Sequence, residues 1–249
     1  IRNVFAPLST LLANKVVLNT AKGIEIGTHA RVSEIFKEVA PKAQYAILSG
    51  PSFALEVAKH LPTAVTIAAE NLEIASVLQA LIATPYFRAY TSQDVTVVEF
   101  AGAMKNVIAI ASGMVTGLHL GYNAQAALIN RGIVEILRIG KVKKAEPMTF
   151  MGLSGMGDLI LTWTGPLSRN RRLCEFLGQW KPLSHAENRV GGVAEGVYTA
   201  NSAYELSRKY RIEMPITEQI YQILYQGKSP TEAVRALMSR DLKEEWQKL

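Results

Sequence analysis

The chain has 249 residues, of which 49% are hydrophobic and 19% charged, and its formal net charge is +6. This composition excludes a disordered protein and provides enough core for one large domain or two modest ones. A single cysteine excludes an intramolecular disulfide framework, and four scattered histidines give no indication of a metal site. The positive charge suits a nucleic acid or an anionic small substrate, but no basic run with interleaved aromatic residues is present.

The first ninety residues alternate between helical and β-branched segments. The pattern predicts strands at 15–20, 43–48, 63–69 and 87–91, and helices at 4–13, 28–40, 53–60 and 72–83. Such alternation is typical of a parallel sheet with helices on its faces. A Gly-x-Gly-x-x-Gly turn, which usually opens a nucleotide-binding sheet, does not occur in the sequence. We therefore expect a Rossmann-like sheet without its opening part.

Strand signals stop at Asp94, and the rest of the chain is helical in pattern. A long apolar run spans 95–120, and a helix over 123–139 carries Arg131, Glu135 and Arg138 as one polar stripe. Further helices are predicted at 168–179, 195–210, 216–226 and 230–240. The predicted fold class is therefore α/β plus all-α: a truncated Rossmann-like parallel sheet over residues 1–92, followed by an all-helical C-terminal domain over 93–249.

Lys105 lies in the long apolar run, where the only other formal charge is Glu99. Helical winding is expected to bury Lys105 among apolar residues, and desolvation favours the neutral amine. A lysine of this kind can give or take a proton near neutral pH. The alternative is an ordinary lysine that reaches water or pairs with Glu99.

Two short motifs follow predicted strands, at the sheet edge where open parallel sheets bind ligands. Lys22 and Gly23 follow the first strand, and Gly50 and Ser52 follow the second. Ser52 is expected to cap the next helix and to leave amides facing an anion. Turn glycines and capping serines are also common in purely structural roles.

Two further segments contain candidate binding residues. Asp158 follows three glycines in GLSGMGD and is expected either to bind substrate hydroxyls or a lysine ammonium, or only to cap a helix. The segment SRNRR over 168–172 begins a predicted helix, where amides and guanidinium groups suit a phosphate, although a solvated basic turn has the same pattern. Gly102, in the predicted helix that carries Lys105, indicates close packing by a neighbour or a ligand.

Seven segments, in this order along the chain, resemble bacterial glycerol-3-phosphate dehydrogenases, the NAD(P)-dependent enzymes that reduce dihydroxyacetone phosphate. They are AKGIE, SGPSFALEV, GAMKNVIAIASGM, NAQAALINRG, TFMGLSGMGDLILT, SRNRR and VAEG. The resemblance implies that Lys105 donates a proton to the ketone oxygen and accepts it in the reverse direction. It also implies catalytic roles for Lys22 and Asp158.

The same resemblance implies the binding residues and the cellular context. It implies NAD(P)H as cofactor, a homodimer, a cytoplasmic enzyme that supplies glycerophospholipid synthesis, and no membrane span or nucleic-acid partner. The implied substrate-binding residues are Lys22, Gly50, Ser52, Lys105, Asp158, Ser168, Arg169 and Asn170. The implied cofactor-binding residues are Lys22, Ala54, Arg169, Val193 and Glu195.

The chain begins at Ile1, and we expect it to be part of a longer protein. Without the glycine-rich turn, this part alone is expected to bind the cofactor weakly or not at all. Two alternatives stay open at this point. One is another member of the hydroxyacid-dehydrogenase superfamily, which shares the sheet, the helical domain and a catalytic lysine. The other is a non-catalytic basic helical protein that binds nucleic acid or acts as an assembly module.

Overall fold

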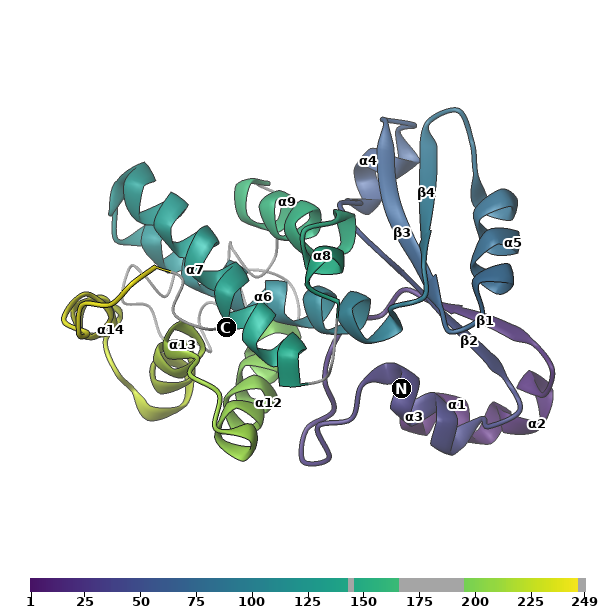
Figure 1. Ribbon diagram of the computed structural model, residues 1–249, viewed down its shortest axis with the longest axis horizontal. Coiled ribbons are helices and arrows are strands. Elements are labelled where there is room, and N and C mark those ends of the chain that lie inside the picture. Colours follow the sequence, from purple (N-terminus) through teal and green to yellow (C-terminus); the bar gives the residue numbers. More distant parts are fainter. Residues whose placement is uncertain (143–145, 166–194, 246–249) are drawn as a thin grey trace. The chain divides into compact units, whose positions relative to one another are not determined.

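A computed structural model of the chain describes residues 1–142, 146–165 and 195–245 (Figure 1). The chain divides into two compact units, one formed by Ile1–Ala103 with Ala145–Asp158, the other by Met104–Lys144 with Leu159–Leu249. The division falls inside the long helix α6 (Val95–Gly117). Each unit is described by itself.

The first unit contains the sheet. Its strands are β1 (Val16–Asn19), β2 (Gln44–Ser49), β3 (Thr63–Ala69) and β4 (Phe87–Ser92). Its helices are α1 (Arg2–Phe5), η1 (Ala6–Leu8), α2 (Ser9–Leu12), α3 (Val32–Val39), α4 (Ala54–Ala58), α5 (Leu72–Ile82), the start of α6, α8 (Pro147–Phe150) and η2 (Leu153–Gly157). All four predicted strands are therefore present, each within about one residue of its predicted bounds.

The strand order is β1-β2-β3-β4, with β1 parallel to β2 and β3 parallel to β4. The central pair departs from the prediction, because β2 runs antiparallel to β3 with Ser49 opposite Thr66. The connection between them contains only the five-residue helix α4 and returns the chain at the edge where β2 ends. A parallel pair would need a crossover that runs back along the whole sheet.

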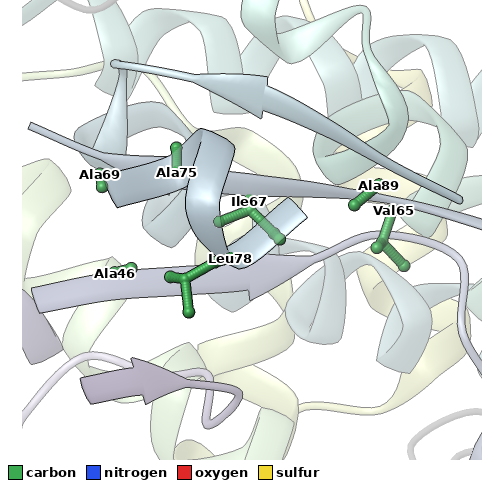
Figure 2. Packing of buried hydrophobic residues seen from close by; sticks show 7 residues of the cluster. All are labelled: Ala46, Val65, Ile67, Ala69, Ala75, Leu78 and Ala89. Carbon is green, nitrogen blue, oxygen red and sulfur yellow. The ribbon is translucent and has the colours of Figure 1, made fainter. Parts of the chain in front are cut away.

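The two faces of the sheet are covered by different helices. Figure 2 shows the core on one face, where Leu78 of α5 packs among side chains from β2, β3 and β4; the cluster is Ala46, Val65, Ile67, Ala69, Ala75, Leu78 and Ala89. On the opposite face, Val95 and Val98 of α6 pack against Ile47 and Ala68. A third cluster, formed by Val32, Phe36 and Ala40, joins α3 to β1 and β2. Alternating side chains of each strand thus face the two helical layers.

The second unit is helical throughout its described residues. It contains the rest of α6, α7 (Gly121–Val142), α9 (Asp158–Thr164, from Leu159 onward), α12 (Glu195–Tyr210), α13 (Pro215–Gln226) and α14 (Pro230–Met238). Helix α13 contacts α7, α12 and α14. The helix predicted over 168–179 lies outside the described residues.

Helix α6 is long and apolar enough to cross a membrane by length and composition alone. However, 89% of its most apolar window is buried inside the protein. This is the pattern of a core helix, because a membrane span exposes its apolar surface to lipid.

Candidate active site

The predicted site residues of the first unit gather where β1 and β2 end. These strands are parallel and Asn19 pairs with Ile47, so the segments that follow them leave the sheet at one edge. Lys22 is half-buried in the segment after β1, and Gly50 follows β2 directly. The shared edge expected from the sequence is therefore confirmed. The carboxyl ends of parallel strands are a common place for ligands.

Gly50 has both a conformational and a packing reason to be glycine. Its φ is +145°, a value that other residues rarely adopt. A Cβ there would also lie 2.9 Å from the Cα of Val65 on β3. The turn that leaves β2 therefore depends on this glycine, whatever ligand the edge binds.

Ser52 does not cap helix α4, contrary to the prediction. The helix begins at Ala54, its N-cap is Phe53, and no side chain caps it. The hydroxyl of Ser52 instead donates a hydrogen bond to the carbonyl oxygen of Gly50 at 3.0 Å. Because the helix begins one residue later than a Ser52 cap requires, this hydroxyl stabilises the turn.

Asp158 is buried and begins α9, as predicted, directly after the π-helical turn η2. Gly155 makes that turn possible, because a Cβ there would lie 2.0 Å from the carbonyl oxygen of Phe150. The Cβ position of Gly157 is 3.6 Å from the ring of Pro51. The glycine-rich segment before Asp158 and the turn after β2 are therefore neighbours in the first unit.

Lys105 is less buried than the sequence predicts. Met104 and Asn106 on either side are buried, whereas Lys105 itself is partly exposed. The amphipathic length of a lysine side chain explains the difference, because its stem can lie on apolar surface while the ammonium reaches outward.

Glu99, which the sequence offers as a partner for Lys105, is bound by other residues. Its carboxylate accepts hydrogen bonds from Arg31 Nη1 at 2.9 Å, from the amide and hydroxyl of Ser33 at 2.7 and 2.6 Å, and from the hydroxyl of Tyr45 at 2.8 Å. Burial raises the pKa of Glu99, and these donors and the Arg31 charge oppose that rise. Burial, and then the Glu99 charge, raises the pKa of Tyr45, so its hydroxyl stays protonated and donates.

The contact with Tyr45 continues toward the segment that carries Lys22. Asn19, at the end of β1, donates from Nδ2 to the Tyr45 hydroxyl at 2.9 Å. The same side chain binds the backbone of Ala21 twice, at 3.0 Å to its amide and 2.9 Å to its carbonyl oxygen. Sequence reasoning missed Asn19 and Tyr45, since single polar residues in a short strand carry no distinctive pattern.

Gly102 of α6 lies close to the side chains of both Lys22 and Ser49. A Cβ on Gly102 would lie 3.1 Å from Ser49 Oγ and 3.3 Å from Lys22 Cδ, so the expected close packing at this glycine is confirmed. Ser49 is fully buried, and its hydroxyl has no hydrogen-bond partner in the part of the chain that the structure describes. A buried hydroxyl of this kind is unusual and is often found where a ligand or water completes the site.

The remaining predicted site residues are either exposed at the start of a helix or lie outside the described part of the chain. Ala54 is exposed at the start of α4, and Glu195 is exposed at the start of α12. Ser168, Arg169, Asn170 and Val193 lie outside the described residues.

Comparisons with known proteins cover nearly the whole chain. The family described as NAD-dependent glycerol-3-phosphate dehydrogenase C-terminus matches residues 94–235, and the corresponding N-terminus family matches residues 1–75. Glycerol-3-phosphate dehydrogenase [NAD(P)+] of Citrifermentans bemidjiense is 52% identical over 233 residues, which are 92% of this chain and 70% of that protein. The Geobacter sulfurreducens protein of the same name is 49% identical over 98% of this chain and 74% of its own length.

A solved structure agrees with these sequence matches. The crystal structure of glycerol-3-phosphate dehydrogenase from Coxiella burnetii superposes with a TM-score of 0.92 at 37% identity, covering 96% of this chain and 74% of that one. The similarity therefore extends across the sheet and the helices alike. On these matches, the chain belongs to the NAD-dependent glycerol-3-phosphate dehydrogenase family.

Proposed function

We propose that this protein interconverts dihydroxyacetone phosphate and sn-glycerol 3-phosphate with NAD(P)H, and so supplies the glycerol phosphate of glycerophospholipids. The observation that carries the proposal is the match of both families along the chain, together with relatives of about 50% identity that are named for this activity. The proposal includes a cytoplasmic homodimer. It also includes a division at residue 92 into a cofactor-binding and a substrate-binding domain.

In the proposed reaction, Lys105 supplies the proton. When a hydride adds to the carbonyl carbon, the ketone oxygen becomes an alkoxide, and the ammonium of Lys105 protonates it. In the reverse direction the neutral amine takes the hydroxyl proton. The partial exposure of Lys105 on an otherwise buried helix supports this role, because a proton donor must reach its substrate.

The residues at the sheet edge are suited to the reacting end of the cofactor and the substrate. The nicotinamide, when bound, supplies or accepts the hydride. Lys22 has no hydrogen-bond or ion-pair partner among residues 1–142, 146–165 and 195–245, and Ser49 adds an unpartnered buried hydroxyl nearby. We assign Lys22 to both ligands, Gly50 and Ser52 to the substrate, and Ala54 to the cofactor.

The other assignments follow from the family resemblance. Asp158, Ser168, Arg169 and Asn170 bind the triose phosphate in this proposal, and Arg169, Val193 and Glu195 bind the cofactor. Asp158 lies buried at the start of α9, directly after the glycine-rich turn that contacts Pro51, and this position supports its part. An arginine that grips two phosphate oxygens is expected to act mainly in substrate binding.

An assay of substrate specificity tests the proposal. Dihydroxyacetone phosphate is expected to drive the oxidation of NADH or NADPH, followed by the loss of absorbance at the reduced nicotinamide band. Ketopantoate and short oxo acids are the controls and are expected to give no rate above background. Turnover of either control in preference to the triose phosphate would identify a sister dehydrogenase instead.

A further inference from the structure

Two sets of contacts in the first unit connect Lys22 or its neighbour Ala21 to helix α6. The first is a chain of side chains, in which Glu99 accepts from Tyr45 at 2.8 Å, Tyr45 accepts from Asn19 at 2.9 Å, and Asn19 binds Ala21. Ala21 immediately precedes Lys22. The backbone beside the lysine is therefore tied to a buried carboxylate on α6.

The second set of contacts is steric. The stem of Lys22 passes Gly102, with Cδ and Cε at 3.3 and 3.4 Å from the position that a Cβ would take. Glu99 and Gly102 are three residues apart and so lie on the same side of α6. The hydroxyl of Ser49 bounds the same small space, at 3.1 Å from that Cβ position.

We propose that α6 positions Lys22 for its ligands, through the Glu99–Tyr45–Asn19 chain and through the absence of a side chain at Gly102. Tyr45 and Gly102 are then positioning residues for the dehydrogenase reaction, since they act through Lys22. The inference rests on the proposed role of Lys22 in binding substrate and cofactor. It predicts that changes at Tyr45 and Gly102 alter catalysis only while Lys22 is present.

The first test compares two variants that each remove one hydroxyl donor from Glu99. Tyr45→Phe breaks the chain to Lys22, whereas Ser33→Ala removes the 2.6 Å hydrogen bond on the other side of the carboxylate. We expect Tyr45→Phe to lower kcat/KM about 5- to 50-fold, because a small displacement of a binding group is costly. Ser33→Ala is expected to keep kcat/KM within about 2-fold of the wild type, because it displaces no group that binds the ligands.

A double variant shows whether Tyr45 acts through Lys22. Lys22→Met is expected to lose most kcat/KM, and adding Tyr45→Phe to it is expected to change the residual rate by less than about 2-fold. A full further loss in the double variant would overturn the inference, as would wild-type kinetics in Tyr45→Phe. If Lys22→Met itself keeps wild-type kcat/KM, the assigned role of Lys22 fails instead.

Amide hydrogen exchange gives a readout that needs no turnover. The amide of Ala21 donates to Asn19 at 3.0 Å, so its exchange is expected to accelerate in Tyr45→Phe but not in Ser33→Ala. Calorimetric titration with glycerol 3-phosphate is expected to show weaker binding in Tyr45→Phe alone. Equal exchange and equal affinity in the two variants would contradict the proposal.

Gly102→Ala tests the steric half. Alanine favours a helix over glycine but its Cβ would lie 3.1 Å from Ser49 Oγ, so a role in packing alone predicts a change in thermal stability with unchanged kinetics. We expect instead a loss of kcat/KM, with partial recovery in Gly102→Ala/Ser49→Ala, where the closest contact is removed. Ser112→Ala is the matched control for Ser49→Ala, because it removes a hydroxyl of α6 that is also buried and has no hydrogen-bond partner among the described residues. A Gly102→Ala variant with wild-type kinetics would overturn this half.

Discussion

Lys105 and Glu135 show how the surroundings of a side chain decide its chemistry. Lys105 remains accessible although its helix is buried. Glu135 on α7 looks from the sequence like part of a solvated stripe with Arg131 and Arg138, but it is fully buried. Its carboxylate accepts from the amide of Ile216 at 2.5 Å and from the amide and hydroxyl of Thr217 at 3.0 and 2.8 Å. A residue of α7 thus caps the first turn of α13, which has no capping side chain of its own.

Replacing Lys105 by alanine is expected to lower kcat by about 10²- to 10⁴-fold, the usual contribution of a positioned proton donor. Steady-state kinetics measures the loss, and circular dichroism checks that the variant is folded. Lys141→Ala on α7 is the control, because that lysine is exposed near the end of its helix. Near-normal turnover in Lys105→Ala would refute the assigned role.

The stability of the protein is expected to depend on pH through Glu135. Burial raises the pKa of Glu135 to about 7 from its ordinary value of 4.5, although the donors of Ile216 and Thr217 oppose the rise. Between these two values the folded state binds a proton that the unfolded state has released, so stability falls as the pH rises through this window. A shift of this size corresponds to roughly 3 kcal/mol.

Glu135→Gln removes the titrating group and keeps one oxygen as an acceptor. Urea unfolding between pH 4.5 and 8 is expected to show the variant gaining on the wild type as the pH rises to 7, with a constant difference above that. A difference that stays constant across the whole range would contradict the raised pKa.

At the scale of elements, the order and type of the strands followed from alternation and β-branched residues, and β3 occupies the predicted 63–69. The antiparallel pairing of β2 with β3 did not follow, because a helix between two strands has the same pattern whether it crosses the sheet or turns back. Helix α3 begins at Val32, four residues later than predicted, since His29 has a φ of +59° that interrupts helical winding. Motifs indicated where Lys22, Gly50 and Asp158 lie in the fold, after β1, after β2 and at the start of α9, while their roles stay predictions. Tyr45 and Ser49 matter only through contacts made by folding.

The packing of α6 against α7 gives a prediction for an element. A Cβ on Gly132 would lie 2.8 Å from Cγ2 of Ile108, so the two helices approach closely there. Gly132→Ala is expected to destabilise the protein by about 1–3 kcal/mol through overpacking, despite the better helix propensity of alanine. In chemical denaturation, the double variant Gly132→Ala/Ile108→Ala is expected to lose less free energy of unfolding than the two single variants lose together. If the two losses simply add, the clash between a Cβ at position 132 and Ile108 does not occur.

At the scale of the whole molecule, the net charge of +6 suits an anionic substrate. The KM for dihydroxyacetone phosphate is therefore expected to rise with ionic strength, because salt screens the attraction. Duplex DNA is the control ligand and is expected not to bind at about 0.15 M salt. Tight DNA binding with a steep salt dependence would favour the nucleic-acid alternative.

The π-helical turn before Asp158 constrains the sequence independently of catalysis. With the Phe150 carbonyl oxygen 2.0 Å from where a Cβ would be, position 155 accepts no side chain at all. In a library that randomises this segment, we expect selection for soluble expression alone to return glycine there. A lineage that lost its enzymatic activity but kept its fold would retain this glycine, so residue 155 is a marker of ancestry rather than of chemistry.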